Sequence, residues 1–193
     1  DVFNGNDGMA GLKFSNWNGG CVIPFLACCP PLIPAGTVCD RLAANYDTLA
    51  TFADLLGLPT PPDTDGLSYL SLLRDPASPG PRRTVVYASD YGPALVDDEG
   101  WKLRVYIPPE ILSENATADF SHDPRVEWQL FFLPDDFAER RDLSRLHPDR
   151  VQRMKKKVLD ECDGNLYHAT PMAHRVCPSL RALTWPEIEG GAV

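Results

Sequence analysis

Three polar residues near the start of the chain have side chains that could take part in chemistry. Asn6 and Asp7 place an amide beside a carboxylate, in a stretch of residues that tolerate positive φ. Lys13 follows as a single ammonium with glycines around it. Taken alone, the pair is equally well an ordinary Asn-Asp-Gly turn, and a lone lysine is by default a solvated loop residue. Their interpretation depends on the elements that position them.

The cysteines and histidines do not indicate a zinc site. The 6 cysteines include no CxxC pair, and the 4 histidines are scattered. An even number of cysteines is compatible with disulfides in an oxidising compartment, and Cys162 and Cys177 could pin the end of the chain. The pairing is otherwise open. Asn115 begins a glycosylation sequon, which matters only if the protein is secreted. We expect structural or surface roles for the histidines: His122, His147, His168 and His174.

The charge of the chain argues against nucleic acid or an anionic membrane as the main partner. The net charge is -9, whereas phosphate binding needs clustered Lys and Arg. The one basic cluster, residues 153–157, lies late in a predicted helix, where cations complement the helix dipole. No apolar run reaches the ~20 residues of a membrane span, and no signal segment opens the chain. The start at Asp1, without Met, suggests a processed or excised piece.

The first part of the chain predicts strands mixed with helices. Residues 1–3 are typical of the end of a buried strand, and the apolar run CVIPFLACC at 21–29 predicts a strand buried on both faces. Residues 45–56 have apolar side chains at helical spacing and end before a glycine. Residues 68–73 predict a short helix. The Pro- and Ser-containing stretch 75–83 is the best domain boundary.

Beyond that boundary the pattern changes to that of an antiparallel sheet closed by a helix. Residues 148–162 predict the helix, with Pro148 in its first turn and an apolar stripe along one side. A turn is expected at 98–100. The predicted strands are residues 84–87, 94–96, 101–106 and 128–133.

The domain organisation follows from this order of elements. We predict an α/β class, with the edge of an α/β/α core at residues 1–75. A small C-terminal α+β subdomain at 84–162 would hold a four-stranded antiparallel sheet and a closing helix, and 163–193 would form a surface tail.

Three stretches, in order, resemble the sulfatase family of the alkaline-phosphatase-like superfamily. The first, within residues 11–38, contains GLK, GG, VIPF and IPAGTV, similar to the family's G-x-K, E-G-G-x-R-V-P and V-I-P-A-G. The second, residues 47–74, is DTLATFADLLGLPTPPDTDG followed by LSYLSLLR, and is the most specific match. The third, within 101–143, joins WKL to QLFFL and to acidic residues, similar to ELYDL-DP-E-NL. The chain therefore resembles the C-terminal portion of a sulfatase, with the edge of an alkaline-phosphatase-like core.

The resemblance implies a particular chemistry. Family members hydrolyse sulfate esters with a formylglycine made from the Cys of a C-x-P-S-R motif, and a divalent cation, usually calcium, polarises the sulfate. This sequence contains no C-x-P-S-R, and CPSLR at 177–181 has a different order. We therefore expect the formylglycine in a missing N-terminal segment or chain, so that this chain alone is inactive. A secreted, lysosomal or periplasmic location is implied.

The resemblance also assigns roles to the three polar residues. Asn6 and Asp7 align, in swapped order, with a family Asp-Asn-Gly whose side chains bind the metal. Lys13 matches the family lysine that contacts the sulfate oxygens, and is thus the expected catalytic and substrate-binding residue. Three departures from the family pattern remove charge near this site. Asn18 replaces a glutamate, Val22 replaces an arginine, and residues 28–29 (Cys-Cys) replace an Arg-Trp pair.

Two other functions are compatible with the sequence. Asn18 and Val22 would suit a non-catalytic sulfatase-like interaction protein. A phosphoryl or phosphonate hydrolase of the same superfamily is the second, since sulfate and phosphate esters share a tetrahedral, anionic geometry. In every case the apolar run at 21–29 would be an aggregation-prone edge if exposed. We expect the chain to be bound to a partner chain or rearranged.

Overall fold

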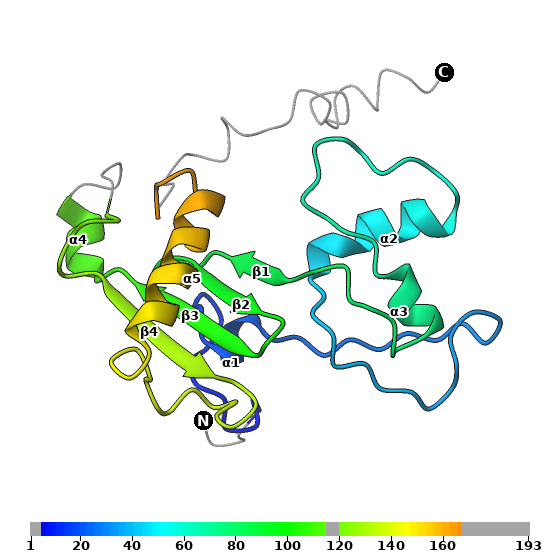
Figure 1. The fold of residues 1–193 in the computed structure, drawn as a ribbon, viewed down its shortest axis with the longest axis horizontal. Coiled ribbons are helices and arrows are strands. Elements are labelled where there is room, and N and C mark those ends of the chain that lie inside the picture. The colour runs from blue at the N-terminus through cyan, green and yellow to red at the C-terminus, as the bar shows by residue number, and fades with distance from the viewer. Residues whose placement is uncertain (1–4, 115–119, 167–193) are drawn as a thin grey trace, which may run out of the picture.

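A computed structural model of the chain describes residues 5–114 and 120–166. The strand predicted at residues 1–3, the sequon at Asn115 and nearly all of the predicted tail lie outside these ranges, as does Cys177. At the centre of one half is the predicted four-stranded antiparallel sheet, in which each strand pairs with the next in chain order (Figure 1). The strands are β1 (Thr84–Tyr87), β2 (Ala94–Asp97), β3 (Trp101–Tyr106) and β4 (Glu127–Phe132).

The turn between β2 and β3 has the residues that its backbone requires. Gly100 has a φ of 89°, which favours glycine, and its N–H donates to the carbonyl of Asp97 at 3.0 Å. The Asp97 carboxylate accepts hydrogen bonds from the backbone of Glu99 at 3.1 Å and Trp101 at 2.8 Å. The turn predicted at 98–100 is confirmed, and it fixes the register in which Leu95 lies opposite Leu103.

One face of the sheet is covered by the long helix α5 (Pro148–Glu161), also as predicted. Pro148 occupies the first turn and His147 is the N-cap residue. The apolar stripe of α5 packs on buried strand residues, including Leu103 and Leu130. A further helix, α4 (Pro109–Glu114), was not predicted; it contributes Ile111 to the same core.

The other half of the chain holds the predicted helices near residues 45–56 and 68–73. A 3-10 turn, Asn45–Asp47, leads into α2 (Thr48–Leu55), and α3 (Leu70–Arg74) follows. Asp47 is fully buried and joins this half together. Its carboxylate accepts the backbone N–H of Ala44 at 2.8 Å and of Leu67 at 2.9 Å, and it pairs with Arg82 from the linker before β1.

Because of the Asp47–Arg82 pair, the free energy of unfolding of this half should decrease when the pH becomes acidic. Burial by itself would raise the pKa of the Asp47 carboxyl, but the hydrogen bonds from Arg82, Leu67 and Ala44 outweigh it, and the pKa is lowered. A lowered folded-state pKa stabilises the fold above the unfolded-state pKa, and this stabilisation is lost as pH falls through the folded-state value. We expect Asp47→Asn to lower the urea midpoint at pH 7, with the difference from wild type shrinking below pH ~4. A difference that stays constant from pH 7 to pH 3 would contradict this.

The strand predicted at 21–29 is wrong. Cys21 ends the short helix α1 (Asn18–Cys21), and residues 22–29 form an exposed segment without regular structure. Phe25 is 63% exposed and Leu26 is 95% exposed. Pro24 lacks an N–H for a ladder, and the described residues offer no strand beside this segment. The apolar run therefore has no neighbours to bury it.

Candidate functional site

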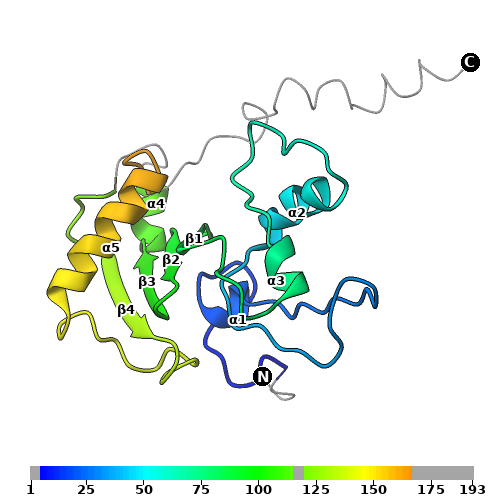
Figure 2. The same ribbon diagram turned by 45° about the vertical axis from the view of Figure 1, so that its right-hand side comes forward.

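The three predicted site residues lie on one folded segment, residues 5–21, called here the N-terminal loop. It lies against the sheet on the side opposite α5, with α1 at its end (Figure 2). The loop is short of regular structure but rich in internal hydrogen bonds. Its geometry is therefore set by turns, glycines and contacts with the sheet.

The face of the sheet under this loop is polar and yet buried. Lys102 and Arg104 alternate on β3 with Leu103 and Val105, which belong to the core against α5. Lys102 is 0% exposed and Arg104 is 4% exposed. A buried cation must be paired or hydrogen-bonded to be tolerated. The partners of both cations come mainly from the N-terminal loop and from the segment after β4.

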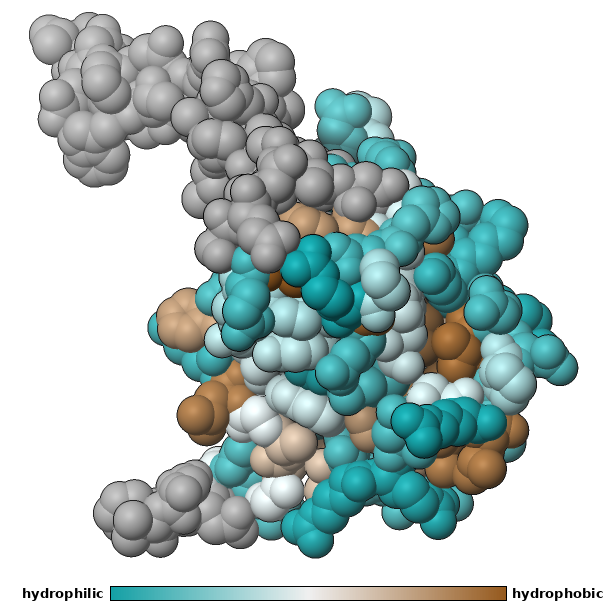
Figure 3. Space-filling view, turned by 90° about the vertical axis from the view of Figure 1, so that its left-hand side faces the viewer, coloured by the Kyte–Doolittle hydropathy of each residue, from teal (hydrophilic) through white to brown (hydrophobic). Residues whose placement is uncertain are grey.

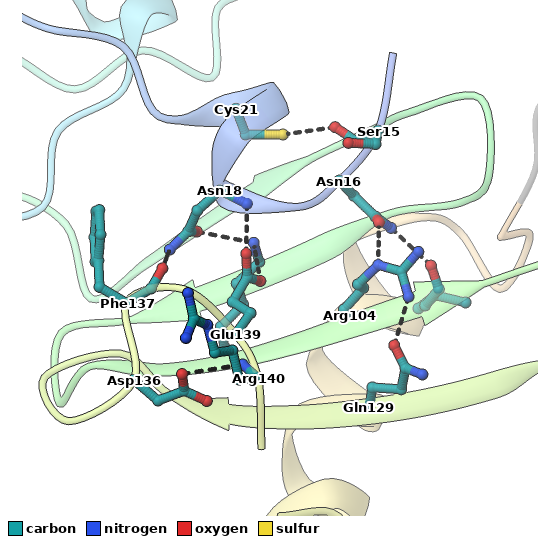
Figure 4. Close-up of polar contacts among 12 residues, drawn as sticks. Ser15, Asn16, Asn18, Cys21, Arg104, Gln129, Asp136, Phe137, Glu139 and Arg140 are labelled. Atoms are coloured by element: carbon teal, nitrogen blue, oxygen red, sulfur yellow. Dashed lines mark hydrogen bonds and ion pairs between the residues drawn. The ribbon is translucent and has the colours of Figure 1, made fainter. Parts of the chain in front are cut away.

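Lys102 is held by Glu139 and Asn18. Its Nζ lies 2.6 Å from Glu139 Oε1 and donates to Asn18 Oδ1 at 2.9 Å. The backbone N–H of Asn18 donates to Glu139 Oε2 at 2.5 Å, and its side-chain amide donates to the carbonyl of Phe137 at 2.9 Å (Figure 4). Burial lowers the pKa of Lys102, whereas the Glu139 carboxylate acts in the opposite direction.

Arg104 is held in the same way by Asn16 (Figure 4). Its Nε donates to Asn16 Oδ1 at 2.6 Å, and its Nη1 donates to Gln129 Oε1 at 2.5 Å. The guanidinium lies 3.9 Å from the ring centroid of Trp17. The amide nitrogen of Asn16 donates to three backbone carbonyls of the sheet region, among them that of Val105 at 2.7 Å. We call this set the polar clamp: Asn16, Asn18, Lys102, Arg104 and Glu139.

Asn6 and Asp7 form a tight turn within the loop. The N–H of Met9 donates to the carbonyl of Asn6 at 3.0 Å, and Asp7 and Gly8 between them have φ of 51° and 73°. The Asn6 amide nitrogen donates to the carbonyls of Met9 at 2.9 Å and Gly11 at 3.1 Å. Since both donors face carbonyls, the Asn6 side-chain oxygen is the atom that could serve a cation. Asp7 is exposed.

Lys13 occupies a second turn and is exposed to solvent. The N–H of Ser15 donates to the carbonyl of Leu12 at 3.1 Å, which closes the turn around Lys13 and Phe14. Phe14 has a φ of 75°, a value that bulky residues rarely adopt. Its carbonyl accepts the N–H of Asp90 at 3.2 Å, and Lys13 Nζ lies 4.8 Å from its ring centroid.

Close backbone packing connects the two turns through Gly19. The N–H of Gly19 donates to the carbonyl of Ala10 at 2.8 Å. A Cβ on Gly19 would lie 2.6 Å from the Ala10 oxygen and 2.7 Å from Asn6 Nδ2. Asn6 and the segment before Lys13 thus share one packed unit, although none of the described contacts joins Lys13 directly to Asn6 or Asp7.

Gly19→Ala tests this packing. The added methyl cannot fit without displacing the Asn6 turn, so we expect a destabilisation of about 1–3 kcal/mol and faster amide exchange across the N-terminal loop. Urea denaturation and hydrogen exchange would measure both. Gly80→Ala is the matched control, because a Cβ there meets its nearest atom at an ordinary 3.5 Å. Equal effects of the two substitutions would contradict the prediction.

The donors fit a hard cation in kind but not in number. Asn6 and Asp7 offer one carbonyl and one carboxylate oxygen, whereas calcium takes six to eight oxygen ligands, roughly. Within residues 5–114 and 120–166 no group of three or more His, Cys, Asp or Glu side chains could hold a metal ion. The remaining ligands would have to come from elsewhere.

Two solved structures show the class of fold. The first, from work on the metabolism of multiple glycosaminoglycans by Bacteroides thetaiotaomicron, has a TM-score of 0.62 and 23% identity, covering 83% of this chain and 33% of that chain. The second, in complex with its substrate D-glucosamine-2-N,6-O-disulfate, has a TM-score of 0.54 and 16% identity, covering 74% and 29%. The predicted α/β class is confirmed.

Sequence comparisons point to the same family. The mouse steryl-sulfatase is 30% identical over 192 residues, covering 89% of this chain and 29% of its own length. The human steryl-sulfatase is 36% identical over 76 residues, and an ulvan-active sulfatase of Formosa agariphila is 34% identical over 73 residues. No protein-family model matches. The predicted resemblance to the sulfatase family is confirmed, and this chain spans less than a third of these curated relatives.

Proposed function

We propose that this chain is the C-terminal portion of a sulfatase, a sulfuric ester hydrolase that acts once the chain is joined to an N-terminal segment. The observation that supports this most is the match to the mouse steryl-sulfatase along 89% of the chain. The expected N-terminal segment supplies the formylglycine and the remaining calcium ligands. The expected location is secreted, lysosomal or periplasmic; none of the helices in the described ranges has the length and apolarity of a membrane span.

Three residues of the N-terminal loop have roles in this proposal. Lys13 is exposed and carries an ammonium that can face the oxygens of a sulfate ester. It would lower the cost of negative charge on the bridging oxygen as the ester bond breaks. The oxygens of Asn6 and Asp7 are the ligands that this chain would contribute to calcium. When bound, calcium polarises the sulfate group.

The distribution of exposed apolar side chains supports a large covering segment. Among the described residues, the exposed large apolar side chains, apart from Phe137 and Leu146, lie between Leu12 and Leu67. Helix α2 alone exposes Leu49, Phe52 and Leu55. The view toward the sheet end is by contrast mostly hydrophilic, with apolar groups near its margins (Figure 3). Many exposed large apolar side chains in one part of a chain are typical of an interface. The N-terminal segment of the same sulfatase is the partner that we propose for it.

The proposal is tested by assaying the longest natural form of the protein for hydrolysis of an aryl sulfate in the presence of calcium. Mass spectrometry should first establish that the form contains a formylglycine. We expect turnover that a calcium chelator abolishes and that the isolated 193-residue chain lacks. No hydrolysis by a form with established formylglycine would refute the proposal.

A non-catalytic interaction protein is the second candidate, and Asn18 favours it. The residue replaces a family glutamate and is buried in the polar clamp, where it brings no charge. A precursor sequence without C-x-P-S-R upstream would support this candidate. A Ser or Thr as the upstream nucleophile would instead indicate a phosphoryl or phosphonate hydrolase.

A further inference from the structure

The polar clamp brings together five of the buried polar and charged residues of the described chain, and none of the five is more than 4% exposed. We propose that the clamp positions Lys13, so that Asn16, Asn18, Lys102, Arg104 and Glu139 are positioning residues for the sulfate-binding lysine. The inference rests on the proposed function, because it takes Lys13 as the residue that contacts the sulfate.

The clamp fixes the segment that follows Lys13. Asn16 and Asn18 are both almost completely buried, at 0% and 1% exposure. The described side-chain hydrogen bonds of Asn16 all join it to Arg104 or to backbone carbonyls near the sheet. Asn18 binds Lys102, Glu139 and the carbonyl of Phe137. With both anchored, the loop has one position on the sheet.

Further contacts connect the segment that the clamp holds to the turn that contains Lys13. The thiol of Cys21 donates to the carbonyl of Ser15 at 3.1 Å, and the hydroxyl of Ser15 donates to the carbonyl of Leu12 at 2.6 Å. A Cβ on Gly20 would lie 2.4 Å from the Ser15 oxygen and 2.5 Å from the Leu12 oxygen. The Lys13 turn therefore rests directly on the segment that the clamp holds.

The backbone of Phe14 shows that this turn is held in an unfavourable conformation. A phenylalanine at a φ of 75° persists only where its surroundings determine it. The surroundings here are the N–H of Asp90, which binds the Phe14 carbonyl, and Asn16 two residues further on. Without the clamp, we expect the turn to relax and the Lys13 ammonium to lose its fixed direction.

Neither cation of the clamp is available to an anion, whereas Lys13 is exposed to solvent. Lys102 is neutralised by Glu139 at 2.6 Å, and its side chain has no exposed surface. Arg104 is buried among Asn16, Gln129 and the ring of Trp17. Neither cation can reach a substrate, so any effect of the clamp on catalysis must pass through the loop.

A double-mutant cycle between Asn18→Ala and Lys13→Met tests the inference in the longest natural form. Asn18→Ala removes the hydrogen bond to Lys102 but keeps the Lys102–Glu139 ion pair, so the protein should stay folded. We expect kcat/KM to fall about 10–100-fold, and the Gly19 and Gly20 amides to exchange at least about tenfold faster. In the Lys13→Met background, Asn18→Ala should change kcat/KM less than about twofold.

The control is Arg150→Ala, on the α5 side of the sheet. It breaks contacts with Asp97 and Trp101 and should leave loop exchange and kcat/KM near wild type. Full additivity in the cycle, or faster exchange with unchanged kcat/KM, would overturn the inference while the proposed function stands. If the wild type shows no hydrolysis despite an established formylglycine, the proposed function fails and the inference fails with it. Failure of the inference alone is recognised by an active wild type whose exchange rates at Gly19 and Gly20 do not change with Asn18→Ala.

Discussion

Glu139→Gln should lower the free energy of unfolding by about 3–5 kcal/mol, since it leaves Lys102 buried without a counter-charge. Lys102 and the Glu139 side chain both have 0% exposure, so water cannot replace the lost partner. The side-chain oxygen of Asn18 and the amide oxygen of the new glutamine could still accept hydrogen bonds from the ammonium, but neither carries a negative charge. Thermal and urea denaturation, followed by circular dichroism, would measure the loss. A fall in Tm of about 10 °C is expected for a chain of this size.

Two controls separate this effect from a general sensitivity to substitution. Asp98→Asn removes an ion pair with Arg83, whose side chain is 85% exposed, and should change the midpoint little. Lys102→Met combined with Glu139→Leu removes both charges together and should recover much of the lost stability, because neither is then left unpaired. A Glu139→Gln variant that unfolds with the wild-type midpoint would contradict the prediction.

Local sequence patterns were sufficient to predict most of the regular structure. Apolar side chains at helical spacing gave α2 and α5, and Gly57, with a φ of 67°, ends the first of these as a glycine should. Strand-like residue patterns, together with Gly100 in a tight turn, predicted the four strands of an antiparallel sheet, whereas the order β1-β2-β3-β4 comes from the structure. These elements are determined by residues close in sequence, so one sequence is enough to find them.

The apolar run at 21–29 shows where such patterns fail. A continuous apolar segment indicates that a segment needs to be buried, but it does not say by what. In this chain Ile23, Phe25 and Leu26 are 62%, 63% and 95% exposed. The apolar composition of the run suits contact with another segment, and within the described ranges no segment covers it. The prediction of a strand buried on both faces is therefore wrong for this chain.

The polar clamp was missed for a related reason. In a strand that reads WKLRVY, Lys102 and Arg104 alternate with apolar residues and would ordinarily face solvent. Burial of that face depends on a loop more than 80 residues earlier in the chain, since Asn18 and Lys102 are separated by 84 positions. The pair of asparagines around Trp17 was the available signal. Glu139 is one of the acidic residues in the third family-like stretch, within residues 101–143, and the sequence assigned it no partner.

For the predicted site, the sequence identified the residue types, and the structure describes the turns and the loop on which they lie. Asn6, Asp7 and Lys13 lie on one loop held against the sheet, but none of the described contacts joins Lys13 to the other two. Asn6 is oriented by its own turn, and Lys13 by a turn that depends on Phe14 at positive φ. The local sequence does not determine from which side an N-terminal segment would approach these residues. The roles of all three thus stay predictions.

Lys13→Met in the longest natural form is expected to reduce kcat/KM for an aryl sulfate by about 10²–10³-fold, the usual result of removing a group that stabilises developing negative charge. Methionine keeps the length of the side chain, and Lys13 is exposed and makes no described hydrogen bond, so stability should not change. Lys157→Met is the control, because it removes an exposed lysine on α5 and should leave kcat/KM unchanged. Lys13→Arg should retain part of the activity, since a cation remains at the turn. If Lys13→Met hydrolyses the ester at the wild-type rate, the ammonium does not face the sulfate, and the match of GLK to the family motif has no catalytic meaning in this protein.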